Sequence, residues 1–406
     1  MGGEWPTVPI GAIGEVFDGP HATPPTQDTG PVFLGIDTLD SGRLNLSATK
    51  HVSDEIFRGW TRRVRPRPGD LVFSYETRIG QAALIPQGLD CCLGRRLALV
   101  RVDRARVLPE WLLYYYLGPT FQNVLRAHTK PGSTVDRIHL TDFPQFPIAV
   151  PPIREQQAIA NLLGGLDDKI DRNRRMAETL EAIATSLFGD WIEREGSRIR
   201  VTAQELIDLR ILQIGDGYRA KNSELTPPGL PFLRAANLNG GLNTADASIL
   251  SEASLSKVGS KISRPGDVAF TSKGTVGRFA RVDKRTPKFV YSPQICFWRS
   301  LNPSQLHPTL LYMLMRARKF RSQIEAVAGQ TDMAPYVSLQ DQRRMLLPIL
   351  PSHQASVGED IESLLSRQAI LTEESNTIAD LRDVLLPKLI SGELRIADAE
   401  RRIVAA

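Results

Sequence analysis

The stretch "RPGDLVFSYETRIG", residues 67–80, returns later in the chain as "RPGDVAFTSKGTVG", residues 264–277. The four residues that open it and the glycine that closes it recur 197 positions further on. Further matches follow at offsets between 197 and 199, among them "PVFLGIDTLDSGRLN" from Pro31 and "LPFLRAANLNGGLN" from Leu230. Because the matches keep their order and spacing, the sequence indicates an internal duplication.

Each copy begins with about 150 residues rich in Gly, Pro and short apolar runs. Runs bounded by turn residues predict strands, here "DLVFS" (70–74), "LALVRV" (97–102), "DVAFT" (267–271) and "ICFW" (295–298). The stretches "PEWLLYYYL" (109–117) and "HPTLLYML" (307–314) predict a helix in each copy. Each copy is therefore expected to fold as a mixed α/β globule of the α+β class.

Each copy ends in a long amphipathic stretch. Apolar residues recur by fours and threes from Ile159 to Leu187, a heptad pattern that predicts a coiled-coil helix from Pro152 to Trp191. A more polar seam follows from Ile361 to Leu385, and Pro387 should end or kink this second helix. The helix-pairing positions are Leu163, Leu166, Ile170, Asn173, Leu180, Leu187, Ile361, Leu364, Leu371, Ile378 and Leu385.

Two such helices in one chain, with a globule between them, pair most simply in antiparallel orientation. The predicted architecture is a pseudo-two-fold internal repeat of two globules joined by two long helices. The predicted boundaries are 1–150 and 197–349 for the globules, 151–196 and 350–395 for the helices, and 396–406 for a tail. Asn173 either fixes the helix register or is a polar residue at the seam edge. Gly164 and Gly165 mark either a close approach of another element or a flexible point.

Composition is that of an ordinary globular protein. Of the 406 residues, 42% are hydrophobic and 23% are charged, and no apolar run approaches the roughly 18 residues of a membrane span. The N-terminus lacks a basic region followed by an apolar core, so we expect a cytoplasmic protein without a membrane partner. Cys91, Cys92 and Cys296 have no metal-site spacing and are expected to be buried free thiols, and the six histidines form no metal-binding pair.

Charge separates sharply along the chain. The total is +5, yet residues 154–195 carry −3 and residues 352–395 carry −4, which leaves +12 on the remainder. Basic loops with interleaved aromatic and polar residues are typical of phosphate and base contacts. Any single arginine can equally be a solvated surface residue, but the pattern as a whole favours binding to double-stranded DNA.

The loops of the duplicated segment supply the candidate base contacts, because Arg and Lys pair with guanine and Glu with cytosine. They are Tyr75, Glu76, Thr77, Arg78, Ser272, Lys273, Thr275 and Arg278. The candidate phosphate contacts are Arg58, Arg62, Arg63, Arg65, Arg95, Arg96, Arg219, Lys221, Lys257 and Lys261. Because the two loops differ in sequence, we expect two different half-sites at a fixed separation, and hence an asymmetric, interrupted target.

The sequence lacks the common motifs of nucleotide binding and methyl transfer. The chain has no GxxxxGK[ST] loop, no strand followed by GxGxxG, and no Asn/Asp-Pro-Pro-aromatic motif of amino-methyltransferases. Asp167 and Asp168 lie on the predicted helix and are expected to be solvated. The sequence predicts recognition without catalysis and no bound metal. The alternatives are a self-sufficient methyltransferase or nuclease with unrecognised motifs, and a coiled-coil scaffold whose basic globules contact an acidic protein.

Several segments resemble one family over essentially the whole chain. Residues 150–191, "VPPIREQQAIANLLGGLDDKIDRNRRMAETLEAIATSLFGDW", resemble the central conserved helix of type I restriction–modification specificity (S) subunits. "FDGPHATP", "GPVFLGI", "TRRVRPRPGDLVFSYETRIGQAALIP", "CCLGRRLALVR" and "GYRAKNSEL" are typical of the target recognition domains of that family. Gly164-Gly165 and the polar seam residues Gln368, Ser375 and Arg382 depart from the family pattern.

The resemblance implies two target recognition domains separated by antiparallel conserved helices, which read a bipartite sequence with a non-specific spacer. It implies two methyltransferase (M) subunits and restriction (R) subunits as partners. It also implies a non-catalytic chain without a cofactor of its own. S-adenosylmethionine, ATP and Mg²⁺ would then be bound by the partners.

Overall fold

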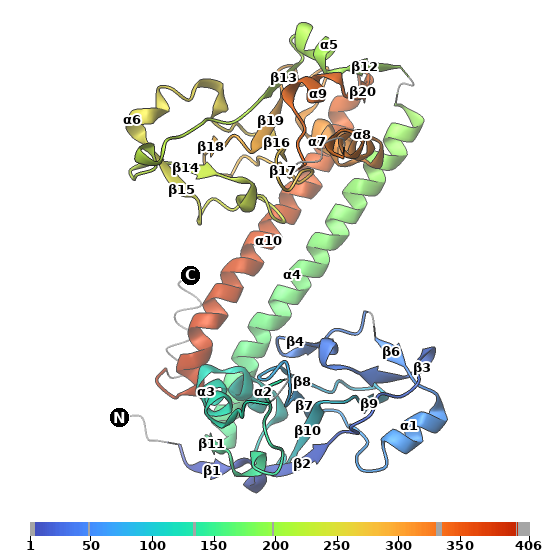
Figure 1. Cartoon of the computed structure of the whole chain (residues 1–406), viewed down its shortest axis with the longest axis vertical. Helices are drawn as coiled ribbons and strands as arrows, with labels where there is room; N and C mark the ends of the chain where they lie inside the picture. Colours follow the sequence, from blue (N-terminus) through green and yellow to red (C-terminus); the bar gives the residue numbers. More distant parts are fainter. Residues whose placement is uncertain are drawn as a thin grey trace. The chain divides into compact units, whose positions relative to one another are not determined.

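The computed structural model describes residues 5–47, 49–132, 135–196, 199–329, 335–394 and 396 (Figure 1). The chain divides into two compact units, one formed by Met1–Asn173 with Glu373–Ala406 and the other by Arg174–Thr372. Each unit therefore contains one globule and part of each of the two long helices. The predicted tail lies outside the described residues apart from residue 396.

The first unit is built on a four-stranded antiparallel sheet in the order β2-β10-β7-β8. A smaller sheet, in the order β6-β3-β9, lies beside it, and two strand pairs, β4 with β5 and β1 with β11, complete the globule. The strands are β1 (Thr7–Pro9), β2 (Gly14–Asp18), β3 (Gln27–Leu34), β4 (Leu39–Asp40), β5 (Arg43–Leu44), β6 (Lys50–His51), β7 (Leu71–Ser74), β8 (Ala82–Leu84), β9 (Cys91–Leu93), β10 (Leu97–Val102) and β11 (Pro147–Ala149).

Side chains alternate across the central strands, so the large sheet has two buried faces. Ala98 and Val100 of β10 join a core that contains Trp111 and residues of both long helices. Leu97 and Leu99 point the other way, into a second core shared with the smaller sheet. The helices of this unit, besides the long ones, are α1 (Asp54–Trp60), α2 (Pro109–Leu117) and α3 (Pro119–His128).

The second unit repeats this order of elements. Its large sheet runs β13-β19-β16-β17 and its smaller sheet runs β15-β14-β18, with β12 paired to β20. The strands are β12 (Arg200–Thr202), β13 (Leu212–Gly215), β14 (Gly229–Leu233), β15 (Ser248–Ser251), β16 (Val268–Thr271), β17 (Phe279–Arg281), β18 (Val290–Tyr291), β19 (Ile295–Ser300) and β20 (Leu346–Pro348). The helices are α5 (Ala203–Asp208), α6 (Glu252–Leu255), α7 (Pro308–Arg316), α8 (Arg318–Ala328) and α9 (Leu339–Arg344). The predicted α+β class and the internal repeat are confirmed.

The long helices are α4 (Ile153–Arg194) and α10 (Gln354–Ile390). In the first unit they run antiparallel, because the pairing partner on α10 falls from Arg382 to Glu374 as α4 rises from Asp167 to Asn173. Every predicted pairing position is buried or half-buried. Pro387 does not end the second helix, since α10 runs on to Ile390 with Pro387 inside it. The alternative, a kink at Pro387, stays a prediction.

Four residues on α4 differ from expectation or bear on an alternative. Asn173 is buried and donates from Nδ2 to Glu374 Oε2 at 2.8 Å, so it lies inside the helix contact and not at its edge. A Cβ on Gly165 would meet nothing within 4 Å, and one on Gly164 would touch only the Tyr114 hydroxyl at 3.8 Å, so no close approach requires either glycine. Asp167 is not solvated, because it accepts a hydrogen bond from Tyr114 and pairs with Arg382.

Candidate nucleic-acid interface

The repeated "RPGD" forms the same turn in both copies. Asp70 N–H donates to Arg67 O, and Asp267 N–H donates to Arg264 O, each at 3.0 Å. Gly69 and Gly266 have φ values of +87° and +89°. Pro at the second position and a positive φ at the third define a type II turn, in which only glycine is unstrained at the third position. The turn leads directly into strand β7 in the first copy and into strand β16 in the second.

The aspartate of each turn is held by a distant arginine. Asp70 receives two hydrogen bonds from Arg101, at 2.9 and 2.7 Å, and Asp267 receives two from Arg299, at 2.6 and 2.7 Å. Both pairs are bidentate, the geometry in which a guanidinium binds a carboxylate most specifically. The shared residues of the repeat therefore build a rigid frame, and the loop that follows the strand is mounted on it.

The first recognition loop, residues 75–78, is tied down at most of its side chains. Tyr75 is buried, and its hydroxyl lies 3.4 Å from His21 Nδ1. Burial, followed by the negative charges of Asp18 and Glu76, raises the pKa of the Tyr75 hydroxyl. Glu76 pairs with Arg96 at 3.1 Å, and Arg78 donates to the Ile36 carbonyl at 3.0 Å. Tyr75 and Arg78 thus support the loop in this conformation, and their base contacts stay predictions.

Thr77 adopts a backbone conformation that its side chain disfavours. Its φ is +65°, whereas the matching position of the second copy is Gly274 with a φ of +80°. A β-branched residue in this region costs on the order of 1–3 kcal/mol, and such strain clusters at functional sites. The Thr77 hydroxyl accepts a hydrogen bond from Arg96, so the strained residue is also oriented.

The second recognition loop, residues 272–278, exposes more of its side chains. Lys273 and Thr275 are exposed at its tip, and Ser272 is buried against Gln294 and Cys296. Arg278 donates to the Leu238 carbonyl at 3.3 Å, a bracing role like that of Arg78 in the first copy. Of the predicted contacts in this loop, Lys273 and Thr275 are therefore the side chains most available to DNA in this conformation.

The predicted phosphate contacts form two surface groups, one in each unit. In the first unit Arg65 pairs with Asp90, and Arg96 braces the recognition loop. In the second unit Lys257 pairs with Glu224 and Lys261 with Asp216. The exposed members are Arg58, Arg62, Arg63, Arg65, Arg95, Arg219, Lys221 and Lys257. Their role as phosphate contacts remains a prediction.

Sequence reasoning missed a pocket beside the first loop. Its volume is about 340 Å³, and its lining includes Asp18, His21, Trp60, Arg62 and Arg63. The two arginines were among the predicted contacts, and the other three residues were not. The sequence signal for Asp18 was its alignment with Asp216, which lies 198 positions further on. The residues that follow the two aspartates differ, which is a sign that the two acids have different surroundings.

Each globule is joined to a long helix by the same glutamine. Gln156 accepts from Leu108 N–H at 2.8 Å and donates to the Arg106 carbonyl at 2.9 Å. Gln354, 198 positions on, accepts from His307 N–H at 3.0 Å and donates to the Ser304 carbonyl at 3.2 Å. Both glutamines are buried. Because each satisfies the backbone just ahead of α2 or α7, the helix and the globule are fixed to each other in both copies.

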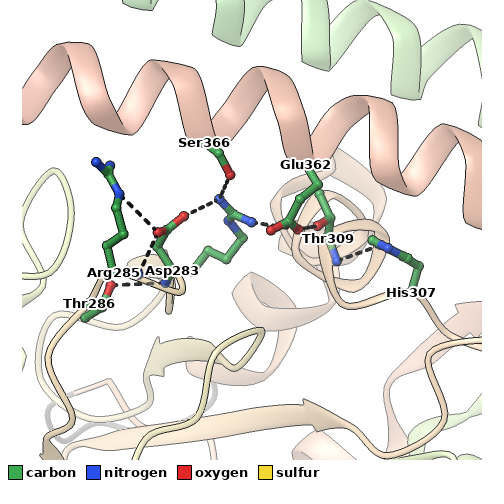
Figure 2. Close-up of polar contacts among 8 residues, drawn as sticks. Asp283, Arg285, Thr286, His307, Thr309, Glu362 and Ser366 are labelled. Atoms are coloured by element: carbon green, nitrogen blue, oxygen red, sulfur yellow. Dashed lines mark hydrogen bonds and ion pairs between the residues drawn. The ribbon is translucent and has the colours of Figure 1, made fainter.

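A polar network adds to this anchor in the second unit. Figure 2 shows Glu362 and Ser366 of α10 facing Asp283 and Thr309 of the globule. Arg281 connects the two sides, because it pairs with Glu362 at 2.8 Å and with Asp283 at 3.0 Å. Burial alone would raise the pKa of Glu362, but the Thr309 hydrogen bond and the Arg281 charge outweigh it and lower that pKa.

The three cysteines are buried, and residue types that bind metals are dispersed in the described ranges. Burial raises the pKa of the Cys91 thiol to about 12 and that of the Cys92 thiol to about 11, and all three cysteines are buried and free, as predicted. Within those ranges, no three His, Cys, Asp or Glu side chains are grouped as metal ligands. Nor do they contain a helix long and apolar enough to cross a bilayer.

Similar proteins are found by sequence and by structure. Residues 61–182 match the family model of the "Type I restriction modification DNA specificity domain". The type I restriction enzyme MjaIX specificity subunit of Methanocaldococcus jannaschii is 24% identical over 97% of this chain and 94% of its own length. The HindI specificity subunit of Haemophilus influenzae is 27% identical over 35% of this chain and 31% of its own.

A solved structure shares the fold. The S subunit of a type I restriction–modification system from M. genitalium matches with a TM-score of 0.67 and 15% identity, covering 95% of this chain and 96% of the other. At that identity the match concerns the fold alone. The sequence matches confirm the family resemblance predicted from the conserved helix and the loop segments, and the shared fold agrees with the architecture that the resemblance implied.

Proposed function

We infer that this chain is the specificity subunit of a type I restriction–modification system, and the proposals below proceed from that identity. The observation that carries the inference is the contrast between the two copies. The turn, the Asp–Arg pair and the helix-anchoring glutamine are the same in both, whereas the exposed loop residues differ. A frame that is kept while its loops diverge is what two readers of different sequences require.

The target we propose is double-stranded DNA with two different half-sites and a spacer of fixed length between them. The first globule reads one half-site and the second globule reads the other, with basic side chains on the phosphates. Two M subunits and the R subunits bind to this chain and carry out adenine methylation and ATP-dependent cleavage. The chain itself performs neither reaction and holds no cofactor, because S-adenosylmethionine, ATP and Mg²⁺ belong to those partners. We place the complex in the cytoplasm.

An exchange of globules tests this proposal. The target is first obtained by selecting bound duplexes from a random library with the full chain and its M subunits. Residues 1–150 are then replaced by the corresponding globule of a relative that reads another sequence. We expect one half-site to change and the other half-site and the spacer to stay as they were. A change in both half-sites would contradict two independent readers, and equal affinity for random and selected duplexes would contradict specific reading altogether.

The alternative of a self-sufficient methyltransferase or nuclease is not favoured by the comparisons. Incubation of the chain alone with DNA, Mg²⁺ and S-adenosylmethionine is expected to give neither methylation nor cleavage. Either product would reopen that alternative.

A further inference from the structure

The pocket beside the first recognition loop contains polar atoms without partners. Asp18 Oδ1 and Trp60 Nε1 are both buried and form no hydrogen bond. Both residues line the pocket together with the exposed Arg62 and Arg63. An unsatisfied buried donor or acceptor costs about 1–3 kcal/mol, so a native chain that keeps one of each in the same pocket has a reason to do so.

The other oxygen of Asp18 is held by a side chain that can move away. Asp18 Oδ2 lies 2.8 Å from His21 Nε2, and the His21 side chain is 66% exposed. Its second nitrogen makes only the long contact to the Tyr75 hydroxyl. The N–H of the His21 ring occupies the position on the Asp18 carboxylate that the N–H of a ligand would take. Because the His21 side chain is mostly exposed, it can leave this position without disturbing the packing of a core.

The second copy holds the corresponding aspartate with a lysine. Asp216, 198 residues after Asp18, receives Lys261 Nζ at 2.9 Å, and the same ammonium donates to the Gly217 carbonyl at 2.9 Å. The counterpart of Trp60 is Val258, a buried residue without a donor. The frame is thus common to both globules, but in the described part of the chain an unpaired carboxylate oxygen and an unpaired indole N–H belong to residues of one pocket in the first globule.

The chemistry of the pocket selects its ligand. A carboxylate repels phosphate and needs a donor, while the indole N–H and the two guanidinium groups need acceptors. In the major groove, cytosine offers an amine with no acceptor on the same base, and its guanine partner offers O6 and N7. Adenine also offers an amine, but its N7 beside that amine would face the carboxylate unfavourably.

We propose that Asp18 is a specificity-determining residue that accepts a hydrogen bond from the N4 amine of a cytosine in the first half-site, with His21 displaced on binding. Trp60 Nε1–H and the arginines at the rim donate to guanine of the same base pair and to the adjoining phosphates. The inference rests on the proposed function and deepens it, because it names a base pair and the residues that read it. The surroundings of the pocket support this proposal, since its residue His21 contacts Tyr75 and its lining includes the predicted phosphate contacts Arg62 and Arg63.

The test compares duplex selections by the full chain with its M subunits, using wild type, Asp18→Asn and Trp60→Phe. Asp18→Asn replaces a pure acceptor with an amide that suits adenine, so we expect one position of the first half-site to lose about tenfold or more of its preference for cytosine. Trp60→Phe should weaken the preference at that same position while leaving thermal stability equal or higher, because it removes an unpaired buried donor. Direct binding to duplexes that differ only at that position, at one salt concentration, measures the size of each effect.

Asp216→Asn is the matched control, since its carboxylate is already paired, and it should leave the first half-site as the wild type reads it. An Asp18→Asn chain with wild-type base preferences would overturn the inference, as would a uniform loss of affinity at every position. Those results would leave the proposed function standing, because the wild type would still select an interrupted target. If the wild type selects no target, the proposed function itself fails.

Discussion

Asp267 is the more deeply buried aspartate of the two repeated turns, and its substitution is expected to be the more damaging. Asp267→Asn would leave the Arg299 guanidinium, whose side chain is 5% exposed, without its counter-ion. Breaking a buried pair by removing one partner costs about 3–5 kcal/mol. We expect a lower midpoint of thermal unfolding, with faster hydrogen exchange confined to the second unit.

The control at this scale is Asp70→Asn in the first unit. There the Arg101 side chain is 24% exposed, so water can partly solvate the charge that the substitution leaves behind. The loss should be clearly smaller than for Asp267→Asn. Equal losses would mean that the turn, and not the buried charge, dominates the effect.

The sequence predicted the turn at this scale but not the pair that holds it. Pro before Gly is a local signal that repeats visibly in both copies. Arg101 lies 31 residues from Asp70, so no local pattern links them. For the same reason Asp18 and Trp60 could not be joined into one pocket from sequence, since the strands β3 to β6 lie between them along the chain. Tyr75, chosen as a base contact for its residue type, is buried because β7 carries it toward the core.

At the scale of elements, Glu362 links α10 to the globule of the second unit, and Glu362→Gln tests that link. The substitution removes the charge that faces Arg281 and weakens the bond from the Thr309 hydroxyl. A hydrogen bond to a charged group contributes about 1.5–3 kcal/mol, so the unfolding free energy of the second unit should fall by about that much at pH 7.

The pH dependence of this loss follows from the lowered pKa of Glu362. A carboxyl whose pKa is lower in the native state stabilises the fold above its unfolded value, here 4.5, and the contribution is lost as pH falls through the native pKa. The difference between wild type and Glu362→Gln should therefore shrink below pH 4.5. Thr309→Val, which removes only the hydroxyl donor, should cost less at pH 7. A difference that is the same at pH 3 and pH 7 would indicate lost packing instead.

The long helices were the elements most visible in the sequence. Their heptad spacing is a property of one continuous segment, and α4 begins within a residue of the predicted start. The polar contacts along them were not visible, because Tyr114, Asp167 and Arg382 come from three separate segments. The short helices α1 and α3 were not predicted either. They carry few apolar positions each, and their place is set by the strands they cover.

At the scale of the whole chain, the duplication was predictable because both copies still share their turn, strand and helix residues in order. The sequence did not predict that the corresponding aspartates of the two copies pair with different side chains. Asp216 pairs with Lys261 in the second copy, whereas Asp18 pairs with His21 in the first, a difference that depends on side chains brought together by folding.

The helices provide the last prediction, which concerns the spacer of the target. Inserting one heptad into α4 after Asn173, and one into α10 before Glu373, adds about 10 Å to each helix and keeps the seam on the same face. At about 3.4 Å per base pair, the selected spacer should lengthen by about three base pairs while both half-sites stay unchanged. Three base pairs also turn the duplex by roughly a third of a turn, so some loss of affinity is expected.

The control is an insertion in α4 alone, which puts the two seams out of step and should lower stability and abolish selection. A spacer that stays the same in the doubly extended chain would show that the helices do not set it.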